Sequence, residues 1–320
     1  MSGRRLVRFP LAWNGLIIQL AASVVAVLAA LPGRADAPLA MTEVAAGVFV
    51  HGGVHEEASP ANNDAIANIG FVLGDDGVAV IDPGGSAKEG RELRAAIRAR
   101  TDRPIRYVIL THVHPDHIFG AAAFRSDNPD FVGHAKLPGA LAQRGGYYLR
   151  RLREALGEGA EGSEIVTPTS LVSTRLDLDF GGRRLVLRAH GAAHTDNDLT
   201  IFDEKTRTLW LSDLLFVDRL PVVDGSLVGW LDELDHLTAI AADRAVPGHG
   251  PTAVPWPVAA EPERRYLETL ARETRAAIKA GTSIAGAVSL VGQSERGRWL
   301  LFDEFHPRNV TASYKELEWE

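Results

Sequence analysis

The stretch Thr111-His112-Val113-His114-Pro115-Asp116-His117 places three His and one Asp within six residues. It directly follows residues 105–110, an apolar run that we expect to form a buried strand. Only 11 His occur among the 320 residues, so this grouping is improbable by chance. A loop at a strand end can turn His112 and His114 to one side and Asp116 and His117 to another. The stretch therefore predicts a metal site, and the rest of the chain is interpreted around it.

Ligand-type residues also follow four other short apolar runs. They are Asp82 after residues 78–81, His194 after residues 184–188, Asp213 after residues 208–211 and His249 after residues 244–246. Active sites gather where strand ends meet loops, so we expect these side chains to join the first group. The chain contains no Cys, which leaves His, Asp and Glu to hold any metal.

The pattern of strands and helices favours mixed sheets covered by helices. Strand-like and helix-like segments alternate, but hairpin-like strand pairs also occur at 171–188 and 199–211. A purely parallel, doubly wound sheet does not give that mixture. Residues 171–178 are expected to be one strand. We predict a catalytic domain over residues 38–255 and a helical C-terminal extension over residues 256–320 that packs on it.

The segment HVHPDH (112–117) matches the HxHxDH signature of the metallo-β-lactamase superfamily, which this chain therefore resembles. Asp82, His194, Asp213 and His249 fall in the order of that superfamily's other motifs, and the resemblance covers roughly residues 45–255. It implies an α/β (α+β) fold, a four-layer αββα sandwich. It also implies a site for two metals at one edge of the sheets.

The resemblance also implies a role for each ligand-type residue. His112, His114 and His194 would bind the first metal, while Asp116, His117 and His249 would bind the second. Asp213 would bridge both ions, and Asp82 would hold the ligand loop by hydrogen bonds. An all-nitrogen and oxygen ligand set suits two zinc ions per chain, and iron or manganese also fit.

Such a site permits hydrolysis by a metal-bridging hydroxide that attacks a carbonyl group. Asp116 is the predicted catalytic residue, because it would both bind metal and orient the hydroxide. The best-known true β-lactamases use Cys where Asp213 stands, and oxygen-reducing di-iron relatives place Glu where His114 stands. The resemblance therefore favours a thioester, another ester or a lactone over a β-lactam as the substrate.

A closer resemblance is carried by residues 209–230 (LWLSDLLFVDRLPVVDGSLVGW), by PGHGP at 247–251 and by the tail at 306–320. These stretches look like the quinoprotein relay system zinc metallohydrolases, relatives of the SoxH proteins. The resemblance implies a periplasmic hydrolase associated with PQQ-dependent dehydrogenases. The alternative is a non-catalytic periplasmic accessory protein that binds metal or a quinoprotein partner.

The substrate pocket is harder to place than the metal ligands. His134 follows the start of a strand, and Phe216 and Arg219 follow Asp213, so these three are the predicted pocket residues. The segment 138–158 is expected to form a helical hairpin or lid. Its Tyr and Arg side chains at 147, 148, 150 and 151 would bind an acidic substrate or simply form a solvated helix face.

The first 37 residues are typical of an export signal. Arg4, Arg5 and Arg8 precede a mostly apolar run over residues 16–31, and small residues follow at 33, 35 and 37. Cleavage would follow Ala37 or Ala35, and an uncleaved membrane anchor is the alternative. Removal of residues 1–37 would take away four Arg and one Asp. The 34 basic and 41 acidic residues of the full chain would then become 30 and 40. We expect a periplasmic protein with a small-molecule substrate, no stable membrane span after processing and no nucleic-acid partner.

Overall fold

Short, mostly apolar strands form two mixed β-sheets in this protein. The computed structural model describes residues 1–3, 6 and 36–320, and residues 36–320 form one compact unit. The predicted export signal therefore lies almost entirely outside the described residues. Within those residues, no helix is long and apolar enough to cross a membrane.

The first sheet has seven strands in the order of the sequence. Neighbours are antiparallel from β1 to β4 and parallel from β4 to β7. The strands are β1 (Thr42–Ala45), β2 (Val48–His51), β3 (Ile69–Leu73), β4 (Val78–Ile81), β5 (Ile105–Leu110), β6 (Asp130–His134) and β7 (Ser170–Val172).

The second sheet has six strands in the order β13-β12-β11-β10-β9-β8. Only β11 and β12 are parallel, because the crossover between them passes through a helix. The strands are β8 (Arg175–Asp179), β9 (Arg184–Ala189), β10 (Leu199–Asp203), β11 (Thr208–Phe216), β12 (Arg244–His249) and β13 (Val254–Pro255).

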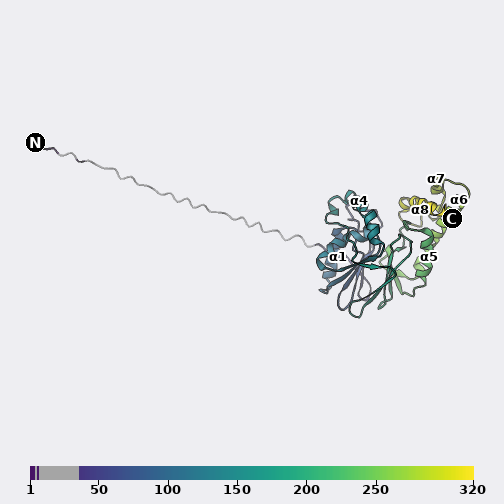
Figure 1. The fold of residues 1–320 in the computed structure, drawn as a ribbon, viewed down its shortest axis with the longest axis horizontal. Helices are drawn as coiled ribbons and strands as arrows, with labels where there is room; N and C mark the ends of the chain where they lie inside the picture. The colour runs from purple at the N-terminus through teal and green to yellow at the C-terminus, as the bar shows by residue number, and fades with distance from the viewer. Residues whose placement is uncertain (4–5, 7–35) are drawn as a thin grey trace. The chain divides into compact units, whose positions relative to one another are not determined.

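Alternation along the strands builds the layers. In β4, Ala79 and Ile81 face the core between the two sheets, while Val78 and Val80 face the core under α1. Helices cover both outer faces, and α1 and α5 lie on opposite sides of the strands in Figure 1. The αββα fold expected from the sequence is confirmed. The α-helices are α1 (Ala87–Arg98), α2 (Pro115–Ile118), α3 (Leu137–Ala140), α4 (Gly146–Leu156), α5 (Leu227–Thr238), α6 (Glu261–Lys279), α7 (Ile284–Leu290) and α8 (Phe302–Leu317).

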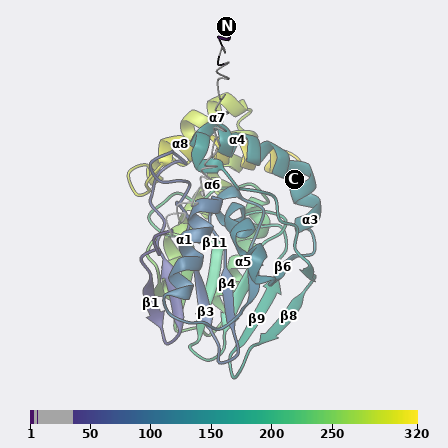
Figure 2. The same cartoon turned by 90° about the vertical axis from the view of Figure 1, so that its left-hand side faces the viewer.

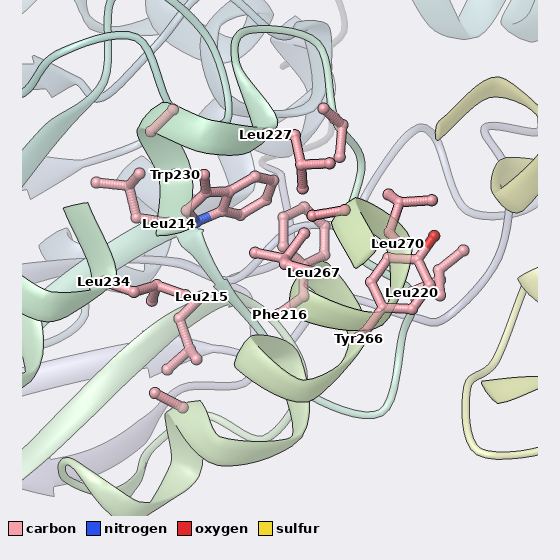
Figure 3. Close-up of a cluster of buried hydrophobic side chains, with 14 of the residues drawn as sticks. Leu214, Leu215, Phe216, Leu220, Leu227, Trp230, Leu234, Tyr266, Leu267 and Leu270 are labelled. Atoms are coloured by element: carbon pink, nitrogen blue, oxygen red, sulfur yellow. The ribbon is translucent and has the colours of Figure 1, made fainter. Parts of the chain in front are cut away.

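The C-terminal helices α6–α8 pack against the second sheet and α5. Figure 3 shows Phe216 of β11, Trp230 of α5 and Leu267 of α6 in one cluster of buried side chains. In Figure 2, α4 and α8 lie near the same end of the sheets. Their side chains line one cavity there, so the extension forms part of the site described below.

Two sequence predictions about strands were wrong. Residues 171–178 are not one strand, because β7 joins the first sheet and β8 begins the second. The apolar pattern predicted a strand that ends at Leu211. In the structure this strand, β11, continues to Phe216, and all nine of its residues are buried. Asp213 therefore lies inside a strand rather than beyond its end.

Candidate metal centre

The loop after β5 derives its shape from one proline. Pro115 begins α2, and a residue before proline is driven to an extended conformation. His114 accordingly has φ −71° and ψ 146° and occupies the N-cap position, where its side chain makes no capping hydrogen bond. Asp116 and His117 follow inside the helical turn. The backbone thus separates His112 and His114 from Asp116 and His117, as the sequence predicted.

Three His rings and Asp213 form the first cluster, with ligand atoms within 4.8 Å of one another. Nδ1 of His194 donates to the Val222 carbonyl at 2.7 Å, and Nε2 of His114 contacts Asp224 at 3.1 Å. These bonds place the protons on the outer nitrogens of both rings. When both rings are neutral, the inner nitrogens, Nδ1 of His114 and Nε2 of His194, face each other at 2.8 Å with lone pairs, and a proton or a metal ion must lie between them.

Asp116, His117 and His249 form the second cluster. Nδ1 of His117 donates to Asp82 at 2.8 Å, and Nδ1 of His249 donates to the Ile66 carbonyl at 2.8 Å. A neutral ring at either position therefore directs the lone pair of Nε2 inward. Burial opposes the charged form of His117, but Asp213, Asp116 and Asp82 raise its pKa well above the ordinary value, so a metal bound there would displace a proton. Oδ2 of Asp116 lies 3.7 Å from Nε2 of His117 and 3.4 Å from Nε2 of His249.

Asp213 lies between the clusters and presents one oxygen to each. Its Oδ2 is 3.2 Å from Nε2 of His194 and 3.6 Å from Nε2 of His112. Its Oδ1 is 3.1 Å from Nε2 of His117 and 3.4 Å from Nε2 of His249. This is the arrangement that a carboxylate bridging two ions requires.

An irregular strand pair gives Asp213 this position. The register between β11 and β12 shifts on both sides of Ser212, whose φ of +47° is left-handed. Such a bulge re-aims the next side chain. On the facing strand, a Cβ at Gly248 would lie 1.9 Å from Oδ1 of Asp213. Only glycine therefore fits beside the carboxylate.

Asp82 makes the hydrogen bonds that were predicted for it. Its carboxylate accepts from the amide and hydroxyl of Thr111, both at 2.9 Å, and from Oγ of Ser212 at 3.0 Å. Together with the bond from His117, these contacts tie the ligand loop to β4 and β11. The backbone of Asp82 has φ +51°, a strained conformation of the kind found at functional sites.

The buried atoms at this centre fit divalent metal ions. Nε2 of His112 is buried without a hydrogen-bond partner. Nε2 of His117 and Oδ1 of Asp213 are also buried, and although they lie 3.1 Å apart, the contact does not have the geometry of a hydrogen bond. Unpaired buried polar atoms are costly, and two facing lone pairs repel unless a cation lies between them. Burial lowers the pKa of His112 well below its ordinary value, so that ring stays neutral. Burial opposes ionisation of Asp213, but His117 and His249 hold its pKa well below the ordinary value.

A cavity of about 800 Å³ opens above the two clusters. Phe216 and Arg219 line it, as the sequence predicted, and so do Tyr148 and Arg151 of the predicted lid. His134 does not belong to its lining. His134 ends β6, is 4% exposed and accepts a hydrogen bond from the Lys136 amide at Nδ1. The alternation of apolar residues in the sequence predicts the strand that ends at His134. It does not show that the cavity lies away from this end of β6.

Four other residues at the centre were missed by sequence reasoning. Ser212 lies directly before a predicted ligand, which is the only signal it carries. Asp224 contacts His114 from a loop, and Glu263 of α6 accepts the Phe216 amide at 2.9 Å. Asp64 lines the cavity with a left-handed backbone, and burial raises its pKa well above the ordinary value. Nothing in the sequence marks these last three, because they reach the centre through tertiary packing.

Fold and site together define a class of protein. The sequence profile of the Metallo-beta-lactamase superfamily matches residues 63–249, more than half of the chain. The chain belongs to the metallo-β-lactamase superfamily, and its His/Asp site is that of a metal-dependent hydrolase.

Curated relatives within this superfamily differ in activity. The chain is 28% identical over 240 residues to the linear primary-alkylsulfatase of Pseudomonas sp. (strain ATCC 19151), covering 63% of this chain and 43% of that protein. It is 25% identical over 150 residues to the metallo-beta-lactamase type 2 of Bacillus sp. (strain 170), covering 47% and 51%. The chain thus spans about half the length of the curated relatives it matches.

Solved structures show the same fold at low identity. The sec-alkylsulfatase Pisa1 from Pseudomonas sp. matches with a TM-score of 0.67 and 17% identity, covering 87% of this chain and 50% of that one. The metallo-beta-lactamase from Pontibacter korlensis matches with a TM-score of 0.59 and 19% identity, covering 72% and 99%. At these identities the likeness extends to the fold alone.

Proposed function

We propose that this protein hydrolyses a carboxylic ester, a thioester or a lactone at a dinuclear centre. One observation carries the proposal. The two oxygens of Asp213 face two separate His/Asp clusters, and both clusters form the floor of a cavity large enough for a small-molecule substrate.

The ligands of each ion follow from the inward nitrogens and oxygens. His112, His114 and His194 would hold the first ion and Asp116, His117 and His249 the second, with Asp213 shared between them. Two such ions supply a nucleophile at neutral pH and an electrophile for the oxygen of the scissile group. Zinc is the metal that we propose, because borderline nitrogen and oxygen ligands suit it. Iron and manganese are the alternatives for the same ligands.

The chain itself would orient the reactants. Oδ2 of Asp116 faces Nε2 of both His117 and His249, so its carboxylate is placed to accept a proton from attacking water. Burial opposes ionisation of Asp116, but His117 and His249 keep its pKa below the ordinary value, which favours the accepting form. The apolar walls at Phe216, Val222 and Phe305 limit the access of bulk water.

Two comparisons bear on which type of bond the protein cleaves. An aspartate at position 213, where the best-known β-lactamases place cysteine, supports an ester-type bond over a lactam. Sulfate-ester hydrolysis is a second candidate. It is favoured by the likeness to alkylsulfatases, whose fold covers more of this chain than the lactamases cover.

A substrate panel on zinc-loaded protein tests the proposal. Carboxylic esters, thioesters, lactones, β-lactams and primary alkyl sulfates would be compared at equal concentration. Turnover of the first three groups supports it, and turnover of sulfates alone would replace it with the second candidate. His236→Gln is the matched control, because His236 is exposed on α5 and lies outside the cavity lining.

We also propose export to the periplasm and work beside a PQQ-dependent dehydrogenase. The Arg-rich start, the apolar run and the resemblance of 209–230 and 306–320 to the quinoprotein relay hydrolases support this. Mass spectrometry of the protein from its host should find an N-terminus near residues 36–38. An intact Met1 on cytoplasmic protein would contradict export. Co-purification with a periplasmic quinoprotein, without turnover of any panel substrate, would support the accessory-protein alternative.

A further inference from the structure

Arg219 is a buried cation whose hydrogen bonds are not satisfied. The residue is 4% exposed, and its Nε has no hydrogen-bond partner. Within the described part of the chain, no Asp or Glu forms an ion pair with it. Among residues 36–320, the only hydrogen-bond contact recorded for its side chain is with Nδ1 of His249, 3.1 Å from Nη1.

That neighbour cannot accept a hydrogen bond. Nδ1 of His249 lies 2.8 Å from the Ile66 carbonyl, and a carbonyl oxygen can only accept. The nitrogen must therefore carry the proton, as it also must if Nε2 is to bind a metal. Nη1 of Arg219 thus faces another donor. Arginine has donors and no acceptor, so this contact leaves the guanidinium unsatisfied.

The guanidinium is held in place without being neutralised. Its Cζ lies 5.3 Å from the centre of the Phe305 ring on α8, a stacking contact that uses none of its N–H groups. Asp64 and Asp116 are near enough to interact with its charge. Asp116 is committed to the second metal cluster, however, and two divalent ions would make the surroundings positive. A buried charge without a partner is strongly destabilising.

We propose that Arg219 binds a negatively charged group of the substrate at the wall of the cavity. This inference rests on the proposed function, since it names the substrate class of the same site. Arg219, Phe305 and both metal clusters line one cavity. A guanidinium presents paired donors that match the oxygens of a carboxylate or a sulfate. The substrate is therefore an anionic ester, with its charge on a carboxylate or on the sulfate that is cleaved.

Exposed basic residues outnumber exposed acidic ones at the cavity, where the acidic ones are Glu57 and Asp224, and Asp224 is paired with Arg144. Arg151 on α4 and Arg308 and Lys315 on α8 are exposed and line the opening. Exposed charges like these steer an anion toward a site more than they hold it there. Arg219 differs from them, because its burial removes the competing water.

Binding of inorganic sulfate to the zinc-loaded protein tests the site directly. Calorimetry should show sulfate binding that Arg219→Gln weakens about 10- to 100-fold, the range for a charge-assisted hydrogen-bonded pair. Arg219→Lys should fall between the two, because it keeps the charge without the planar fork. Arg272→Gln on α6 is the control, since Arg272 is exposed and outside the cavity lining. Unchanged sulfate affinity in Arg219→Gln would overturn the proposal.

Kinetics separate this role from a structural one. A half-ester with a free carboxylate, its neutral diester and an alkyl sulfate would be compared. Arg219→Gln should raise KM about tenfold or more for the anionic substrate while kcat and the zinc content stay near wild type. The neutral diester should be little affected. Equal loss for charged and neutral esters would mean that Arg219 only supports the fold. The half-ester and the sulfate show which oxyanion the site takes.

Two failures remain distinguishable. If wild type turns over no panel substrate but sulfate binding depends on Arg219, the proposed function is wrong and the anion site stands. If wild type hydrolyses esters but sulfate binding ignores Arg219, the proposed function stands and this inference is wrong. Should Arg219→Gln fail to fold, Arg219→Lys decides by the same sulfate measurement, with a loss of roughly threefold or more as support.

Discussion

The floor and the roof of the cavity are built on different physical principles. On the floor, the outer nitrogen of each of the five ligand rings lies at hydrogen-bond range of an oxygen that orients the ring. For His112, His114, His117, His194 and His249 in turn, the oxygen belongs to Thr111, Asp224, Asp82, Val222 and Ile66. The roof is formed by α4 and α8, where exposed Arg and Lys side chains face the opening. Hydrogen bonds fix the side chains of the floor in the positions that metal binding needs. The exposed side chains of the roof are not fixed in this way and can differ with the substrate.

Removing the metals should have the largest effect, because the whole floor depends on them. Treatment with a chelator should abolish hydrolysis and lower Tm by roughly 5–15 °C, given the stabilisation that a tightly bound ion supplies. Activity assays and thermal unfolding before and after dialysis measure both. Recovery on adding zinc is the control. An unchanged Tm would contradict a metal centre at the buried, unpartnered atoms of His112 and His117.

Asp213→Asn should be the most damaging single change on the floor. It keeps the shape of the side chain but removes its charge and one good bridging oxygen. We expect a hydrolysis rate at least about a hundredfold lower, more than a supporting residue typically costs. Unfolding should stay cooperative, because the change is local. Elemental analysis should show loss chiefly at the second ion. Wild-type turnover would refute the bridging role.

Asp82→Asn should cost less, since Asp82 acts through other residues. The amide can no longer accept from both His117 and the hydroxyls of Thr111 and Ser212, so the inward lone pair of His117 loses its support. Metal affinity or activity should fall about 10- to 100-fold. A zinc titration followed by calorimetry measures the loss. If affinity is unchanged, the hydrogen bonds of Asp82 serve only the fold.

A change on the roof should have the smallest effect. Arg308→Gln removes one exposed charge at the mouth. We expect KM for an anionic ester to rise only about two- to threefold at low salt, and the effect to fade as salt screens the charge. Zinc content and Tm should not change. A large loss of kcat would mean that α8 takes part in the chemistry and that floor and roof are not separate.

The floor was predictable from sequence for a physical reason. Its ligands cluster in HVHPDH or follow short apolar runs, and most of them lie where strands end. Asp213 is the exception, because it lies inside β11. The residues that orient the ligands were less visible. Thr111 and Ser212 adjoin ligands, but Asp224 and Asp64 lie in loops whose paths depend on the whole fold. His134 illustrates the opposite failure, since it also ends a strand and yet does not line the cavity.

The strand prediction at 171–178 failed because a local pattern cannot show a change of sheet. Both β7 and β8 have alternating side chains, and Ser173 and Thr174 between them give no strong turn signal. The sheet that each strand joins is decided by its neighbours β6 and β9. The roof was equally hard to predict, because α8 reaches the cavity from the far end of the sequence.

The division of the ligands between the sheets has a mechanical consequence. His112, His114, Asp116 and His117 extend from the first sheet, while His194, Asp213 and His249 extend from the second. A pair of ions held by both groups would act as a reversible cross-link that closes a long loop, from His114 to His194 at the first ion and from His117 to Asp213 at the second. Cross-links that close long loops restrict the unfolded chain most. The supply of metal would then set how long the two sheets resist being pulled apart, and proteolysis of the metal-free chain should begin with their separation.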